Sequence, residues 1–286
     1  MRILAFDIEE WFHLLDNEST RTYREWNCFE KRIHLNVDKI LSYLDETKNS
    51  ATFFVLGWIA EKYPEIVRQI HDSGFEIGSH SHMHQLVYTQ SPLEFKNDLI
   101  RSIELLQEIT GNKIRYFRAP GFSITKNNLW SFDIINELGI EIDCSIFPAF
   151  RSHGGMPTFG YSKPSILKYN GITLKELPLN THLIFRKNIV FSGGGYFRVL
   201  PYNLIKKWTK KSDYVMSYFH PRDFDPAQPI IQGLSLHRLF KSYVGLKGSE
   251  QKFKKWLKDF DFMDIQTADL QIDWENVKTI TLPNSL

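Results

Sequence analysis

Residues 51–80 read ATFFVLGWIAEKYPEIVRQIHDSGFEIGSH, and this stretch decides the fold. The apolar run at 51–56 is typical of a buried strand, and 75–78 resembles a second one. The stretch between them, 58–74, has the length and apolar spacing of an amphipathic helix. Pro64 inside it predicts a kink or a division into two helices. Strand, helix and strand in this order indicate a parallel β/α unit.

The same alternation continues along the chain. Further strands are expected at 2–6, 114–118, 140–143, 172–177, 214–219 and 262–266, and further helices at 36–47, 92–111 and 125–139. The second of these helices should end at Gly111, and the third should begin with a Thr125 cap and end at Gly139. Eight strands alternating with helices favour an α/β fold closed as a barrel, with an open doubly wound sheet as the alternative. No glycine-rich phosphate loop follows the first strand, which counts against a dinucleotide-binding fold.

The sequence favours a single domain over residues 1–286, because it contains no internal repeat, low-complexity tract or linker. Residues 144–170 are expected to form a long loop, and such loops in compact domains are often binding elements. Residues 226–286 should add a helix and a last strand that complete the barrel.

Composition narrows the function classes. The net charge is only +2, so nucleic acid is not an expected partner. Lysine clusters at 206–211 and 252–259 are more typical of solvated helix faces, although they leave peripheral membrane contact open. Two cysteines in 286 residues do not make a secreted disulfide framework, and the start MRILAFD shows no export segment. A cytoplasmic protein without a transmembrane segment is therefore expected, either free in the cytosol or at the cytoplasmic face of the membrane.

Polar residues gather where the predicted strands end. They are Asp7, Glu9 and Glu10, His80 to His84, RAPG at 118–121, DCS at 143–145, and HPRDFD at 220–225. In a β/α barrel these ends meet at one mouth, where such barrels carry out chemistry. Each motif alone fits an ordinary turn or helix cap, but together they supply two imidazoles and a carboxylate for a metal, a base and an acid. A helix would place His80 and His84 on one face and a strand would align all three histidines, so spacing alone leaves the ligands open.

These motifs, in this order, resemble the NodB-type polysaccharide deacetylases, carbohydrate esterase family 4. The resemblance rests on Asp7 with its nearby carboxylates, His80-Ser81-His82-Met83-His84, Arg118-Ala119-Pro120, Asp143-Cys144-Ser145 and Tyr218-Phe219-His220, and it extends over residues 2–225. GGGYFRVLPY (193–202) and FHPRDFDP (219–226) are more similar to the branch associated with bacterial surface and exopolysaccharide gene clusters.

The resemblance implies a distorted (β/α)7-8 barrel that holds one divalent metal, first of all Zn²⁺, with Co²⁺, Mn²⁺, Fe²⁺ or Ni²⁺ as alternatives. By position, His80 and His84 are ligands and His82 is not. The family commonly has two adjacent aspartates, whereas Ile8 follows Asp7 here. By analogy with members that have Asp-x-Asp, Asp7 is the base and Glu9 the metal ligand, with Glu10 as a rival.

The resemblance also implies the remaining roles. His220 would protonate the departing amine, and a backbone N–H near Gly121, where the family usually has tyrosine, would stabilise the oxyanion. Arg118 would orient Asp7, and Asp143 would orient His220.

The implied reaction removes N-acetyl groups from amino sugars of a bacterial polysaccharide, a lipid-linked oligosaccharide or a glycan precursor. Two alternatives stay open at this point. One is a catalytically inactive, sugar-binding barrel, and the other is a metal-dependent amidase that acts on a non-sugar amide.

Overall fold

The computed structural model describes residues 1–15, 17, 20, 22–151, 153–184 and 187–283. Its main sheet has eight strands in the order β12-β7-β8-β6-β5-β4-β3-β2. The strands are β2 (Ala5–Ile8), β3 (Thr52–Val55), β4 (Glu76–Ser79), β5 (Tyr116–Phe117), β6 (Ile142–Asp143), β7 (Ser165–Tyr169), β8 (Ile172–Glu176) and β12 (Lys278–Thr281). Strands β2 to β6 and β8 run parallel, and β7 is antiparallel to β8.

Two further pairs of strands accompany this sheet. β1 (Arg2–Ile3) lies parallel to β11 (Val215–Met216), and β9 (His182–Ile184) pairs antiparallel with β10 (Lys187–Ile189). Because β1 leads into β2, β11 continues the main sheet beyond β2, and a bridge between Phe6 and Phe219 extends this pairing.

The sheet curls until its two sides meet through side-chain hydrogen bonds, one of which runs from the Tyr214 hydroxyl to the Pro178 carbonyl at 2.8 Å. Just after β8, the Leu179 amide donates to the Ile146 carbonyl. The side chain of the next residue, Asn180, accepts a hydrogen bond from the Met216 amide at 3.1 Å. Ser192 also contacts the Asn180 amide oxygen at 3.2 Å. Side-chain hydrogen bonds therefore replace strand pairing where the two sides of the sheet meet. The barrel is thus a distorted one, which confirms the predicted fold class.

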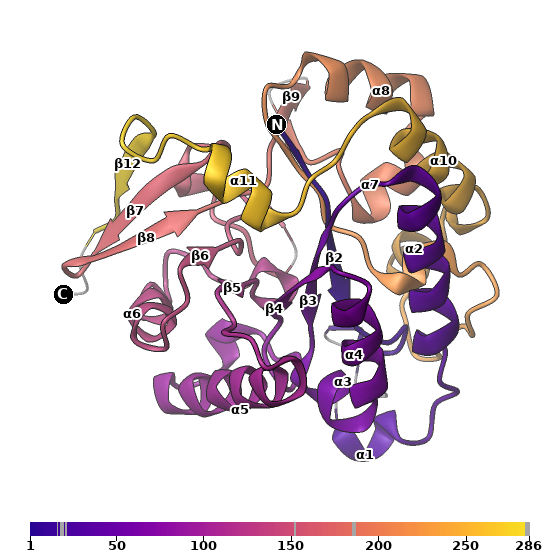
Figure 1. Ribbon diagram of the computed structural model, residues 1–286. Helices are drawn as coiled ribbons and strands as arrows, with labels where there is room; N and C mark the ends of the chain where they lie inside the picture. The colour runs from indigo at the N-terminus through magenta and orange to yellow at the C-terminus, as the bar shows by residue number, and fades with distance from the viewer. Residues whose placement is uncertain (16, 18–19, 21, 152, 185–186, 284–286) are drawn as a thin grey trace.

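Helices surround the strands (Figure 1). They are α1 (Tyr23–Trp26), α2 (Ile33–Thr47), α3 (Gly57–Lys62), α4 (Pro64–Asp72), α5 (Pro92–Thr110), α6 (Trp130–Glu137), α7 (Gly194–Val199), α8 (Tyr202–Lys211), α9 (Leu236–Tyr243), α10 (Leu246–Asp259) and α11 (Ile265–Gln271). Four short 3-10 turns are described at Val87–Thr89, Pro120–Phe122, Pro157–Phe159 and Pro221–Phe224. Helix α10 packs on β2 through an aromatic cluster in which Phe6 contacts Phe53 and Phe253 at centroid distances of 5.1 and 5.9 Å. No described helix is both long and apolar enough to cross a membrane.

Several sequence predictions are confirmed. Pro64 divides the 58–74 stretch into α3 and α4 and occupies the first turn of α4. Gly111 ends α5 in the left-handed conformation, with φ of 70°. Gly139 follows α6 with φ of 77°.

Three predictions were wrong. The 262–266 stretch makes only a bridge from Met263, because the Asp264 side chain accepts from the Thr267 amide and starts helix α11. The predicted loop 144–170 contains β7, and the last strand is β12. Helix α6 begins at Trp130, since Thr125 binds the Asn128 side chain instead of capping the helix.

Candidate active site and metal centre

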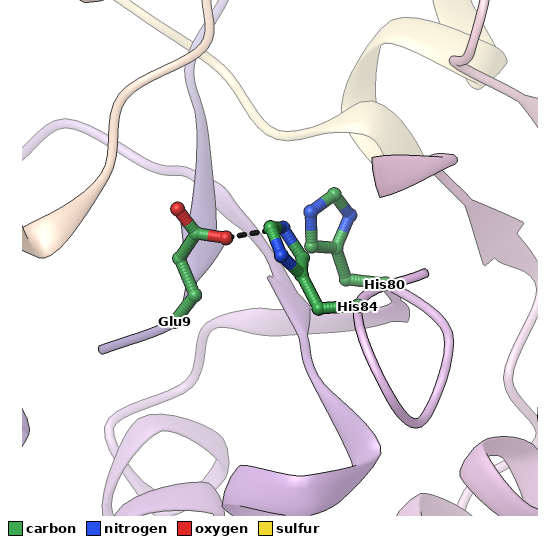
Figure 2. Close-up of side chains that lie close together, drawn as sticks. All are labelled: Glu9, His80 and His84. Carbon is green, nitrogen blue, oxygen red and sulfur yellow. Dashed lines mark ion pairs between the residues drawn. The ribbon is translucent and has the colours of Figure 1, made fainter. Parts of the chain in front are cut away.

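Glu9, His80 and His84 form a buried group at the carboxyl ends of the first strands. Glu9 follows β2 directly, and the two histidines lie in the loop after β4. Their exposed fractions are 5%, 2% and 8%, and one ligand atom from each lies within 4.8 Å of the others. Figure 2 shows the three side chains facing one another, with Glu9 Oε2 2.5 Å from His84 Nε2. A carboxylate and two imidazoles are a donor set that suits zinc and similar divalent ions.

The hydrogen bonds around this group fit a metal. His80 donates from Nδ1 to the Arg118 carbonyl at 2.7 Å, which leaves its Nε2 free to bind an ion. Burial lowers the pKa of His80 to about 4, so its imidazole is neutral near pH 7, the form that ligates metals. The buried Glu9 Oε2 lies against His84 Nε2, but this contact lacks hydrogen-bond geometry. A buried carboxylate needs a compensating partner, and a cation held by both groups would supply it.

The loop that carries the histidines has a strained backbone. Ser81 and His84 have positive φ values of 66° and 52°, which cost free energy in residues other than glycine. Asp98 on α5 holds the loop, because its carboxylate accepts from the amides of His82 and Met83 at 2.7 and 2.9 Å. The His82 side chain points elsewhere, with Nε2 3.4 Å from Glu61. The structure thus separates His82 from the His80 and His84 pair.

Glu10 faces away from the candidate ligands. Its Oε1 accepts from the amides of Arg32 and Ile33 at 2.9 and 3.1 Å. Ile33 is the first residue of α2, so Glu10 satisfies free N–H groups at that helix start. This arrangement accounts for two adjacent glutamates with different tasks.

Asp7 lies beside the group, buried and paired with Arg118. The Arg118 guanidinium donates to Asp7 Oδ1 at 2.8 Å, and both side chains are almost fully buried. Burial alone would raise the pKa of Asp7, but Arg118 and the nearby His80 and His220 lower it below its usual range. The other oxygen, Oδ2, lies 3.8 Å from His220 Nε2. An ionised carboxylate with one anchored oxygen and one oxygen toward the cavity is suited to accept a proton.

The partner of His220 is Asp223, not Asp143, which corrects the sequence prediction. His220 donates from Nδ1 to Asp223 Oδ2 at 3.1 Å. Burial would lower the pKa of His220, but the Asp223 hydrogen bond and the carboxylates of Glu9 and Asp7 raise it. Arg198 Nε lies 3.4 Å from the other Asp223 oxygen.

Asp143 is held on the neighbouring strand. It stands in register with Glu176 of β8, and its Oδ1 accepts from the Ser145 hydroxyl at 2.6 Å. Burial, together with the Asp143 carboxylate beside it, raises the pKa of Glu176 well above its usual value. Asp143 therefore belongs to a buried carboxyl pair between β6 and β8, which fixes its side chain away from His220.

A sequence signal for Asp223 was present in His220-Pro-Arg-Asp. Proline favours the first position of a helical turn, and the acidic residue two positions later can reach back to the residue that caps the turn. In the structure Pro221–Phe224 forms this turn, and Asp223 also accepts from the His220 amide at 2.9 Å.

The candidate ligands, the base and the acid line one cavity of about 870 Å³. Its lining includes Asp7, Glu9, His80, His84, His220 and Gly121, whereas Arg118 and Asp143 lie behind the wall. Gly121 has a positive φ of 62°, and a Cβ there would come within 2.6 Å of a Leu15 methyl group. This conformation and the short approach to Leu15 favour glycine at position 121.

Two family models match the chain. The polysaccharide deacetylase model matches residues 24–142, and the model of a domain of unknown function, DUF3473, matches residues 144–269. Among curated proteins, the peptidoglycan-N-acetylglucosamine deacetylase of Bacillus cereus is 32% identical over 37% of this chain and 42% of its own length. The chitooligosaccharide deacetylase of Azorhizobium caulinodans is 32% identical over 36% of this chain and 48% of its own length. The chain thus spans less than half the length of these two relatives.

Solved structures share the fold over almost the whole chain. A Mycobacterium smegmatis protein assigned as a polysaccharide deacetylase superposes with a TM-score of 0.65 at 18% identity, covering 99% of this chain and 93% of its own. A carbohydrate esterase family 4 pseudoenzyme from Bacillus anthracis gives a TM-score of 0.50 at 12% identity, covering 99% and 68%. The chain therefore contains a polysaccharide deacetylase region over residues 24–142, followed by a DUF3473 segment over residues 144–269.

Proposed function

We propose that this protein is a metal-dependent hydrolase that removes N-acetyl groups from amino sugars of a bacterial glycan. The observation that carries the proposal is the placement of three candidate ligands, an Arg-held carboxylate and an Asp-held imidazole around one cavity. We also propose that it belongs to the branch associated with surface and exopolysaccharide gene clusters. The cytoplasmic location expected from the sequence stays a prediction.

Glu9, His80 and His84 would hold the metal. Zn²⁺ is the ion we expect first, and the donor set also accommodates Co²⁺, Mn²⁺, Fe²⁺ or Ni²⁺. When bound, the ion would supply a Lewis acid that polarises the acetyl carbonyl and makes water more acidic.

The chain's own residues move the protons. Asp7 accepts a proton from the water whose oxygen attacks the acetyl carbon, and Arg118 keeps that carboxylate ionised beforehand. His220 donates a proton to the sugar nitrogen as the carbon–nitrogen bond breaks, which releases acetate and a free amine. The Gly121 backbone at the cavity wall is our candidate for the N–H that stabilises the oxyanion.

A catalytically inactive sugar-binding barrel is the alternative. The fold is shared with a pseudoenzyme, so the fold by itself does not establish turnover. A metal-dependent amidase that acts on a non-sugar amide is the other alternative. Substrate screening separates all three, because only the proposed enzyme releases acetate from N-acetylated sugars.

The test is acetate release by the Zn²⁺- or Co²⁺-loaded protein from chitooligosaccharides and N-acetylglucosamine derivatives. Asp7→Asn and His220→Ala should each lower the rate by about 100-fold or more while metal content stays the same, because each removes one proton-transfer group. An unchanged rate in His220→Ala would overturn the acid assignment. Sugar binding without acetate release by the metal-loaded protein would establish the inactive barrel instead.

A further inference from the structure

The catalytic cavity carries more positive charge than the reaction requires. Its described lining contains five arginine or lysine residues against three carboxylates, and the cations are Arg151, Arg198, Arg222, Arg238 and Lys241. All five belong to residues 144–269, the DUF3473 segment, whereas Asp7, Glu9, His80 and His84 come from the part of the chain before it. The segment of unassigned function thus supplies the charge of the cavity wall.

The three carboxylates already have partners. Asp7 is paired with Arg118, which is a sixth cation behind the wall, and Glu9 lies against His84. Asp223 holds His220 and lies near Arg198. These contacts engage all three carboxylates of the described lining, and none of the three forms an ion pair with Arg151.

Hydrogen bonds to neutral groups also hold two of these arginines, in addition to the contact between Arg198 and Asp223. Arg198 donates to the carbonyls of Ser242 and Lys241 at 2.7 and 2.9 Å. Arg222 donates to the Gln228 amide oxygen at 3.0 Å and also to the Ser242 carbonyl. Such contacts satisfy donors, but the positive potential of the wall persists and favours anionic ligands.

Arg151 is surrounded by three aromatic rings, whereas Arg222 lies over only one, that of Tyr243. The Arg151 guanidinium lies 5.0, 5.4 and 5.7 Å from the ring centroids of Phe122, Phe147 and Tyr218. Its NH1 atom is buried without a hydrogen-bond partner, and no described carboxylate forms an ion pair with it. Ring faces fix the plane of a guanidinium while leaving its N–H edge available, and that edge matches a carboxylate or phosphate.

We propose that the DUF3473 segment adapts this cavity to a glycan that carries an oxyanion, either a carboxylate or a phosphate, near the N-acetylated sugar, and that Arg151 binds this group. The inference rests on the proposed function, because it names the substrate class of the same site. It gives Arg151 a specificity role and leaves proton transfer to Asp7 and His220.

The test measures binding rather than turnover. Calorimetry on the metal-loaded full chain would compare chitotetraose, which is neutral, with a hyaluronan tetrasaccharide, which carries carboxylates, and with N-acetylglucosamine 1-phosphate. We expect at least one anionic probe to bind about 10-fold more tightly than chitotetraose at low salt and to lose that advantage as salt rises. The probe that gains affinity identifies the carboxylate or the phosphate as the source.

Arg151→Gln should weaken the anionic probe about 10-fold and change chitotetraose binding less than 2-fold. Arg68→Gln, the same charge change on an exposed residue of α4, is the matched control and should change neither. Arg151→Lys keeps the charge but not the planar edge, so it should recover part of the affinity and guards against a variant that merely misfolds.

Equal affinity for neutral and anionic probes in the wild type, or equal behaviour of the Arg151→Gln and Arg68→Gln variants, would overturn the proposal. The outcome is separable from that of the proposed function. Anion-dependent binding without acetate release would reject only the proposed deacetylase activity. Acetate release without a preference for anionic probes would reject only the proposed role of Arg151.

Discussion

His220 donates from Nδ1 to Asp223 Oδ2 at 3.1 Å, and its Nε2 lies 3.8 Å from both Asp7 and Glu9. The hydrogen bond fixes the ring orientation and directs Nε2 into the cavity. Burial would raise the pKa of Asp223, but the hydrogen bond with His220 and the nearby Arg198 guanidinium lower it to about 2, so the carboxylate stays ionised. The acid and its support thus come from one short turn after β11.

Asp223→Asn should lower kcat by about 10- to 100-fold, because it weakens the support of His220 without touching the ligands. Asp223 raises the pKa of His220, so its loss should move the basic limb of the kcat profile to lower pH. The measurement is a pH–rate profile for acetate release with metal content checked in parallel. Asp143→Asn is the control, and a larger profile shift in that variant would restore the original sequence prediction.

Asp98→Ala should weaken metal binding about 10-fold or more, although Asp98 touches no ligand side chain. The substitution removes the acceptor for two loop amides and lets the strained backbone between Ser81 and His84 relax. Competition with a chromophoric chelator would measure the metal Kd. Asp98→Asn keeps one acceptor oxygen, so its metal Kd should lie between those of the wild type and Asp98→Ala. Wild-type affinity in Asp98→Ala would show that the loop keeps its shape without Asp98.

Gly121→Ala should destabilise the fold and reduce turnover. A non-glycine residue with φ near +60° costs about 1–2 kcal/mol, and the new Cβ also meets Leu15. Gly111→Ala is the matched control, because Gly111 has φ of 70° with no atom within 4 Å of a Cβ. Urea unfolding should show a loss of stability for both variants that is larger for Gly121→Ala, and only Gly121→Ala should lower acetate release. Full activity in Gly121→Ala would exclude a role for this backbone position.

The stability of the protein should depend on pH through Glu76 at the other end of β4. Burial raises the pKa of Glu76 to about 7, although Thr52 and Tyr116 donate hydrogen bonds that oppose the shift. The folded state therefore holds this proton more tightly than the unfolded chain, so stability is full below pH 4.5 and falls as pH rises to about 7, by roughly 2–3 kcal/mol.

Glu76→Gln should flatten this dependence, since glutamine can still accept from Thr52 and from the Gln266 amide. Urea unfolding of both proteins at several pH values gives the difference curve. A wild-type curve parallel to that of Glu76→Gln from pH 4.5 to 7 would show that Glu76 does not titrate in this range.

The sequence predicted the barrel and most of the candidate site, because strand ends are marked locally. A strand followed at once by Asp7 or His80 is visible in the residues themselves. The predicted partner of His220 was wrong, because the neighbours of a side chain at a strand end depend on how the strands pair in the folded chain. Asp143 stands beside Glu176 across a strand pair, while the four-residue turn Pro221–Phe224 brings Asp223 back to His220.

The contribution of Arg151 could not be predicted from the sequence. Its ring contacts involve Phe122, Phe147 and Tyr218, which come from three separate segments and meet only in the folded chain. The hairpin of β7 and β8 was not predicted, for a related reason. Its turn, Asn170-Gly171, has two positive φ values typical of a tight hairpin, but the predicted loop 144–170 includes β7.

The central claim is that Glu9 completes the metal site, and metal stoichiometry in matched glutamate variants tests it most directly. After loading with Zn²⁺ and gel filtration, the wild type and Glu10→Gln should each retain about one ion per chain, because Glu10 only caps α2. Glu9→Gln and His84→Ala should retain far less than one. Full occupancy in Glu9→Gln, or loss of the ion in Glu10→Gln instead, would contradict the account.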